Sequence, residues 1–192
     1  MNNLTSLIAL VGGEEFSSDC MEMDARILSF VKPLNAKAKV AIVPTAAAFQ
    51  RPDLAAKNGI NHFESLGADS YAVEILSKND ANNSKFIPCL ENANLIYLTG
   101  GDPNHLVSVF NNSSILDLMR TLGNQGCFIA GSSAGAMVLG NRMFHRTLKT
   151  GLSLIGNIIT LPHHEKADPK SIHRSIVSTP VSYTHLPLPT KA

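Results

Sequence analysis

A serine stands between two glycines where two short apolar runs meet, in the segment Gly131-Ser132-Ser133-Ala134-Gly135. The apolar runs cover residues 127–130 before this segment and 136–139 after it. They predict a strand, a tight turn and a helix, because glycine fits into a sharp turn where a side chain would clash. Such a turn presents the serine hydroxyl at a helix N-terminus, beside N–H groups able to stabilise an oxyanion. The same G-x-S-x-G pattern also arises where small residues merely pack between a strand and a helix. The motif alone therefore leaves this structural interpretation open.

Apolar runs of strand length alternate along the whole chain with segments of helical periodicity. The expected strands cover residues 7–10, 39–43, 71–75, 95–98, 127–130 and 155–161, and the expected helices cover 19–31, 52–66, 80–90, 103–110 and 114–122. This alternation is typical of an α/β fold with a mostly parallel sheet and helices on both faces. Such sheets bind ligands at the carboxyl ends of their strands, where we expect Gly12-Gly13, Gly100-Gly101 and the Ser133 turn to lie.

Length and composition restrict the class of protein further. The chain has 192 residues, of which 44% are hydrophobic and 16% charged, as in a globular domain. Its formal net charge of +1 offers no electrostatic basis for binding nucleic acid or an anionic membrane, and no apolar run is long enough to span a bilayer. The scattered cysteines Cys20, Cys89 and Cys127 suggest neither disulfides nor a metal site. We therefore expect a cytoplasmic protein without a metal or other cofactor.

One α/β domain is expected over residues 1–179, followed by a non-native or disordered tail over residues 180–192. The tail lacks strand or helix periodicity, contains Pro180, Pro187 and Pro189, and resembles a translated sequencing adapter. The hypothesis that follows is that the domain is incomplete at its C-terminal side.

A serine nucleophile needs a base within hydrogen-bonding distance. His163 and His164 follow the apolar run 155–161 and Pro162, so we expect them at a strand end on the same edge of the sheet as Ser133. The backbone N–H groups of Ala134 and Gly101 are the expected oxyanion donors.

The Gly100-Gly101 turn also has a purely structural interpretation. Asp102 and Pro103 follow it, and they suit the N-cap and the first position of a helix. Both interpretations can hold together, because a capped helix N-terminus also favours an anionic substrate group.

Taken together, these segments resemble the serine-peptidase family that contains cyanophycinase and aspartyl dipeptidase, within the class I glutamine amidotransferase-like fold. The resemblance extends over nearly all of residues 4–176. It rests on the segments 11–16 (VGGEEF), 43–47 (VPTAA), 98–103 (LTGGDP), 131–136 (GSSAGA) and 161–165 (LPHHE). It implies a flavodoxin-like three-layer arrangement of helices and sheet.

The resemblance also implies roles for individual residues. Ser133 would be the nucleophile and His163 the base, with His164 as the alternative, and the oxyanion hole would come from Gly101 and Ala134. The reaction would pass through an acyl-enzyme on Ser133 and hydrolyse small peptides, aspartate-containing ones in particular, without a metal.

Two details of the implied site stay open. An acidic substrate requires a basic group, for which Arg51, Arg142 and Arg146 are candidates. The family's third triad residue is an acid downstream of the histidine. Glu165 follows His163 by only two residues, a spacing that does not ensure contact, so it is an alternative rather than an assignment; Asp168 also lies nearby.

Two other functions compete with hydrolysis. The same cleft could belong to a non-catalytic domain that binds a small molecule or a protein partner, since one fold hosts many functions; the presence of both Ser133 and His163 favours catalysis. A nucleotide-binding domain is disfavoured, because neither glycine pair extends into G-x-G-x-x-G or a P-loop. We expect a small peptide as the partner, neither nucleic acid nor membrane, and leave a homodimer open.

Overall fold

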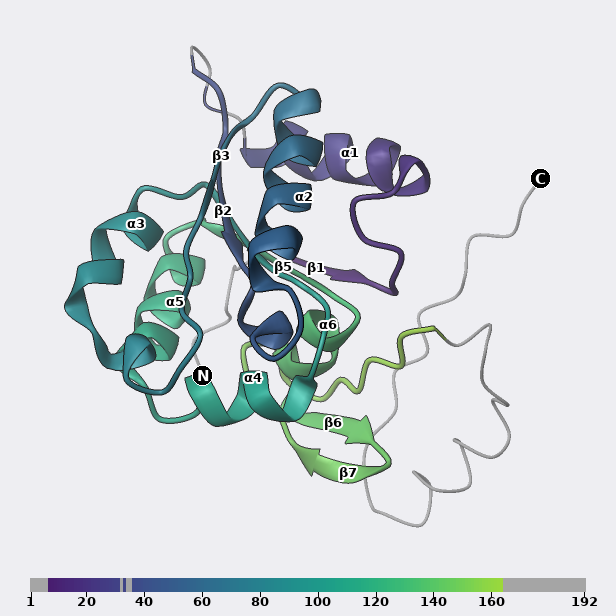
Figure 1. Cartoon of the computed structure of the whole chain (residues 1–192), viewed down its shortest axis with the longest axis vertical. Coiled ribbons are helices and arrows are strands. Elements are labelled where there is room, and N and C mark those ends of the chain that lie inside the picture. Colours follow the sequence, from purple (N-terminus) through teal and green to yellow (C-terminus); the bar gives the residue numbers. More distant parts are fainter. Residues whose placement is uncertain (1–6, 32, 34–35, 164–192) are drawn as a thin grey trace.

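A sheet of five parallel strands forms the centre of the part of the chain that the structure describes (Figure 1). The structure is a computed structural model, and it describes residues 7–31, 33 and 36–163. The strands lie in the order β1-β5-β4-β2-β3. Their bounds are β1 Ile8–Val11, β2 Lys39–Val43, β3 Asp69–Ala72, β4 Leu95–Leu98 and β5 Phe128–Ser132. The parallel sheet expected from the alternating pattern is thereby confirmed.

Helices cover both faces of this sheet, which makes the predicted three layers. Their bounds are α1 Met21–Val31, α2 Pro52–Ser65, α3 Ile87–Glu91, α4 Pro103–Phe110, α5 Ser114–Asn124 and α6 Ala134–Leu139. Alternate residues of β2 face opposite sides: Val40 and Ile42 pack with α1 and α2, whereas Ala41 and Val43 pack with the residues of α3 to α6. Because both faces are covered, β4 and β5 are buried along their whole length, which explains why they read as continuous apolar runs.

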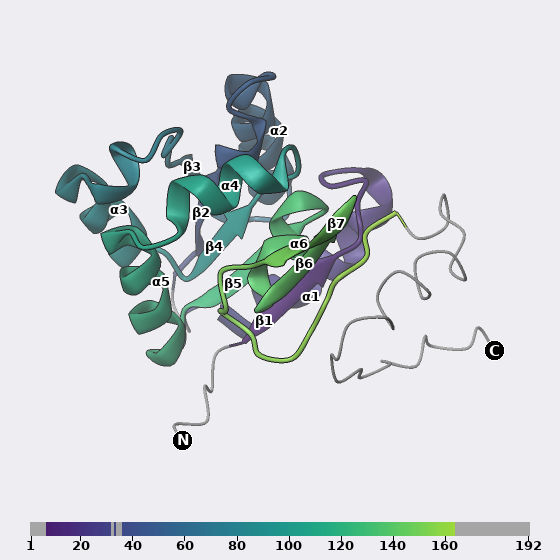
Figure 2. The same ribbon diagram turned by 90° about the horizontal axis from the view of Figure 1, so that it is seen from below.

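Short elements connect the helices and strands. Single turns of 3₁₀ helix lie at η1 Ser18–Cys20, η2 Thr45–Ala47, η3 Asp80–Asn82 and η4 Ser84–Phe86. After α6 the chain forms an antiparallel hairpin of β6 (Arg142–His145) and β7 (Thr147–Thr150), which the sequence pattern did not predict. Figure 2 shows this hairpin beside α6, with the segment that follows it running past β1.

The structure corrects three expected elements. Residues 155–161 form no strand of the sheet: Ile155 makes only an isolated bridge to Gly140, and Asn157 has a left-handed φ of 57° that breaks an extended run. The helix expected over 80–90 is divided into η3, η4 and α3, because Asn83 is extended and caps η4 with its side chain. The strand expected over 71–75 begins and ends earlier, at Asp69 and Ala72.

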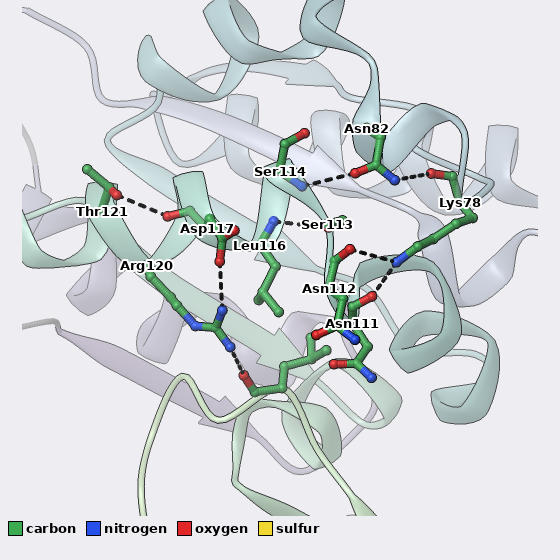
Figure 3. A network of polar contacts seen from close by, with 11 residues as sticks. Lys78, Asn82, Asn111, Asn112, Ser113, Ser114, Leu116, Asp117, Arg120 and Thr121 are labelled. Atoms are coloured by element: carbon green, nitrogen blue, oxygen red, sulfur yellow. Dashed lines mark hydrogen bonds and ion pairs between the residues drawn. The ribbon is translucent and has the colours of Figure 1, made fainter.

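A network of polar contacts holds the connection between α4 and α5 (Figure 3). Lys78 donates through Nζ to the carbonyls of Asn111 and Asn112, with 3.2 Å to the latter. Asn82 donates to the Lys78 carbonyl at 2.9 Å and accepts from the Ser114 N–H at 3.1 Å. A cation is thus held just beyond the C-terminal end of α4, which ends at Phe110 with Asn111 as its C-cap, and a cation there suits the helix dipole.

The same network extends to the segment that leads toward His163. Arg120 of α5 donates to Asp117 at 2.9 Å, as Figure 3 shows, and to the carbonyl of Leu152 at 3.0 Å. The side chain of Arg120 therefore ties α5 to the chain after the β6–β7 hairpin. None of the helices in the described ranges is long and apolar enough to cross a bilayer.

Candidate active site

Ser133 lies between β5 and α6 in a conformation that few side chains adopt. Its φ is 47° and its ψ is −108°, and a positive φ at a non-glycine residue is uncommon and costs energy. A β-carbon on Gly131 would stand 2.8 Å from the nitrogen of Ala136, and one on Gly135 would stand 2.9 Å from the carbonyl carbon of Leu98. Both glycines are therefore required by the close approach of β4, β5 and α6, as the motif predicted.

His163 lies directly against this serine. Its Nε2 is 3.0 Å from Oγ of Ser133, within the range in which a base can accept a hydroxyl proton. The backbone N–H of His163 donates to the carbonyl of Gly12 at 3.0 Å, and its ring lies over Gly13. The chain after the hairpin thus returns to the end of β1, although it adds no strand there.

The Gly100-Gly101 turn follows β4, beside the Ser133 turn. Gly101 has a φ of 140°, and a β-carbon there would stand 2.8 Å from the nitrogen of Ala47. The next residue, Asp102, donates its N–H to the Ala46 carbonyl at 2.7 Å and caps α4 by accepting from Asn104 and His105, with Pro103 at the start of the helix. The capping interpretation of this turn is confirmed.

Ala134 is the first residue of α6 and is buried. Its N–H belongs to the first turn of that helix, where N–H groups have no acceptor within the helix. Of the two expected donors, Ala134 directly follows Ser133 at the start of α6, and Gly101 lines the same cleft as Ser133.

Glu15, to which the sequence pattern gave no role, lies inside the same site. Both of its carboxylate oxygens accept from the N–H of Gly100, at 3.0 and 2.8 Å. Burial raises the pKa of the Glu15 carboxyl, and the Ser132 hydroxyl and Gly100 amide partly oppose that rise. The signal available in the sequence was a pair of acidic residues, Glu14 and Glu15, after a Gly-Gly pair at a strand end, but neither the choice between them nor the partner could be inferred from it.

A cleft of about 480 Å³ connects these groups. Its lining includes Ser133, His163, Gly101, Glu15 and Arg51. The structure thus brings the expected nucleophile, base and glycine turn to one cavity.

The three arginine candidates lie in different places. Arg51 lines the cleft and forms an exposed ion pair with Asp53, at 3.0 Å between Nη2 and Oδ2. Arg142 belongs to β6, and Arg146 stands in the turn of the hairpin. The other candidates, His164, Glu165 and Asp168, lie outside the described residues. Within those residues, no three His, Cys, Asp or Glu side chains are grouped so that they could hold a metal ion.

The sequence also matches a known peptidase family. The model of peptidase family S51 matches residues 7–184. Among curated proteins, the cyanophycinases of Trichormus variabilis and of a Nostoc species are each 30% identical to the chain over 141 residues, which are 66% of this chain and 47% of theirs. The chain therefore spans about half the length of the curated relatives it matches.

Solved structures resemble the fold as a whole. The crystal structure of a peptidase from an acI-B1 Actinobacterium superimposes with a TM-score of 0.80 at 26% identity, covering 91% of this chain and 76% of the other. A putative peptidase E from Listeria monocytogenes superimposes with a TM-score of 0.66 at 21% identity, over 90% of this chain and 86% of the other. At 21% identity the second likeness concerns the fold alone.

Proposed function

Because the chain belongs to peptidase family S51, we propose that it is a serine-type peptidase that hydrolyses small peptides through an acyl-enzyme on Ser133. The observation that carries this proposal is the 3.0 Å distance between Oγ of Ser133 and Nε2 of His163, at the edge of an open cleft. A strained serine beside a histidine base, on a turn between a strand and a helix, is the arrangement of a nucleophile elbow.

The proposed reaction has two halves. In the first, Nε2 of His163 accepts the hydroxyl proton while Oγ of Ser133 bonds to the substrate carbonyl carbon; the carbon–nitrogen bond then breaks, and the amine leaves with the proton from His163. In the second, water gives a proton to His163 and attacks the ester. The carbon–Oγ bond breaks, the proton returns to Ser133, and the carboxylic acid leaves.

The negative charge that develops on the carbonyl oxygen requires donors that are already in place. We assign these to the backbone N–H groups of Gly101 and Ala134. Removing a single donor of an oxyanion hole costs about 10²- to 10³-fold in kcat in a well-studied serine protease, so the two turns would account for a large part of catalysis.

We further propose that the substrates carry an acidic residue, and that Arg51 recognises it. The support is that, of the three arginine candidates, Arg51 lines the cleft and Arg142 and Arg146 do not; a substrate carboxylate would replace Asp53 or bind beside it. A planar guanidinium suits a carboxylate through two parallel hydrogen bonds. Replacing Arg51 by Met should raise KM for an aspartyl dipeptide and leave KM for a neutral dipeptide little changed.

The test of the proposed function is covalent labelling. A fluorophosphonate should label the protein at Ser133, and the variants Ser133→Ala and His163→Ala should lose labelling and hydrolysis of aspartyl dipeptides while unfolding at temperatures close to that of the wild type. Labelling that persists in Ser133→Ala, or no labelling of the folded wild type, would contradict it. Peptide binding without turnover, equal in wild type and Ser133→Ala, would instead favour the non-catalytic binding domain.

A further inference from the structure

Glu15 connects two strand ends that are not neighbours in the sheet. It follows β1, whereas its partner Gly100 follows β4, and β5 lies between these two strands. The side chain therefore reaches across the end of β5, where the Ser133 turn begins. A β-carbon on Gly100 would touch the Glu15 carboxylate at 3.2 Å and the β-carbon of Ser133 at 3.4 Å, so the three residues are packed together.

The glycine turn needs such a partner. Two consecutive glycines can adopt many backbone conformations, and the N–H of Gly101 helps catalysis only if it keeps one direction. Glu15 holds the N–H of Gly100 on one side, at 2.8 and 3.0 Å. On the other side, the N–H of Asp102 is held by the carbonyl of Ala46 at 2.7 Å. The peptide group between Gly100 and Gly101, whose N–H is the proposed oxyanion donor, is thus held from both ends.

We propose that Glu15 is a positioning residue, which fixes the Gly100-Gly101 turn so that the Gly101 N–H points at the reacting carbonyl. This inference rests on the proposed function. The Glu15 carboxylate accepts from the N–H of Gly100, which is not assigned to the oxyanion hole. Glu15 therefore affects catalysis only by fixing the conformation of the Gly100-Gly101 turn. On this proposal, residue 15 must supply an acceptor oxygen at this distance, but it need not carry a negative charge.

Three substitutions separate these requirements. Glu15→Gln keeps the length and an acceptor oxygen, Glu15→Met keeps the length without an acceptor, and Glu15→Asp keeps the charge but shortens the reach by one methylene group. Glu22, an exposed acid on α1, provides the matched control Glu22→Ala. The measurements are kcat and KM for an aspartyl dipeptide, the rate of labelling by a fluorophosphonate, and hydrogen exchange of a peptide that spans residues 98–102.

Glu15→Met and Glu15→Asp should lower kcat and the labelling rate about a hundredfold, the loss that a misplacement of about 1 Å can cause, while KM stays near that of the wild type. Exchange at Gly100 should become faster in both. Glu15→Gln should keep kcat within about threefold, and Glu22→Ala should behave as the wild type.

Several results would overturn the proposal. Equal losses in Glu15→Gln and Glu15→Met would show that charge rather than the hydrogen bond matters, and a rise in KM alone would show that Glu15 contacts the substrate. Unchanged exchange at Gly100 in Glu15→Met and Glu15→Asp would show that the carboxylate does not hold the turn. The exchange measurement needs no enzymatic activity, so it decides on Glu15 even if the wild type is not labelled and the proposed function fails.

Discussion

The ring of His163 lies over Gly13, so that a β-carbon on Gly13 would stand 2.6 Å from Nδ1 of that ring. Gly13 also has a φ of 148°, a conformation that residues with side chains rarely adopt. The backbone of His163 is anchored one residue away, by its hydrogen bond to the Gly12 carbonyl. The end of the first strand therefore determines where the proposed base can lie, and the Gly-Gly pair leaves the space for it.

Replacing Gly13 by Ala should therefore displace the imidazole from Ser133. We expect kcat and the rate of fluorophosphonate labelling to fall about a hundredfold, since a shift of about 1 Å suffices for such a loss. The control is Gly156→Ala, where a β-carbon meets no atom within 4 Å. Labelling of Gly13→Ala at the wild-type rate would mean that His163 does not need this position.

Gly101→Ala should damage both the fold and the site. Its β-carbon would clash with the backbone of Ala46 and Ala47, and its φ of 140° disfavours any side chain. The control is Gly67→Ala, because Gly67 also has a positive φ, 86°, but open space around it. Both variants should unfold at lower temperature, whereas only Gly101→Ala should lose labelling of Ser133. If the folded fraction of Gly101→Ala reacted as fast as the wild type, the position of this turn would not matter for catalysis, because alanine keeps the backbone N–H.

Local features of the fold could be predicted from the sequence where the physical cause is itself local. Residues 95–98 form a continuous apolar run because β4 is buried on both faces, and the motif around Ser133 predicted its turn because only glycine fits there. The prediction of a strand over residues 155–161 was wrong, because an apolar run predicts burial but does not specify a strand with which it can pair. The role of Glu15 depends on the order of strands β1, β5 and β4 in the sheet, which no local pattern encodes.

The stability of the protein should depend on pH through Glu15. Burial raises the pKa of its carboxyl above the ordinary 4.5 in the folded state, so the folded state holds this proton more tightly than the unfolded state. The stability contributed by Glu15 should therefore fall as the pH rises from about 4.5 through the raised pKa, and stay reduced above it. Glu15→Gln removes this cost, so it should unfold at a higher temperature than the wild type at pH 7 to 8.

Thermal unfolding of both proteins between pH 4.5 and 8 measures this effect. The difference between the two unfolding temperatures should shrink as the pH falls toward 4.5, where the carboxyl is half protonated in the unfolded state and more fully protonated in the folded state. If the difference in unfolding temperature stayed constant over this pH range, the burial of the Glu15 charge would not affect the stability of the protein.

A buried polar pair lies away from the cleft, where Asp24 of α1 meets His62 of α2. Nε2 of His62 donates to Oδ2 of Asp24 at 2.8 Å, and the two side chains are 5% and 0% exposed. Removing Asp24 leaves His62 buried without this hydrogen bond, so Asp24→Ala should lower the free energy of unfolding by about 1–3 kcal/mol. Asp24→Asn keeps an acceptor for His62 and should lose less.

The exposed pair of Asp117 and Arg120 is the control: Asp117→Ala should change stability little, since exposed pairs contribute little. Urea unfolding measures all three, and equal losses in Asp24→Ala and Asp117→Ala would show that burial does not matter for this pair.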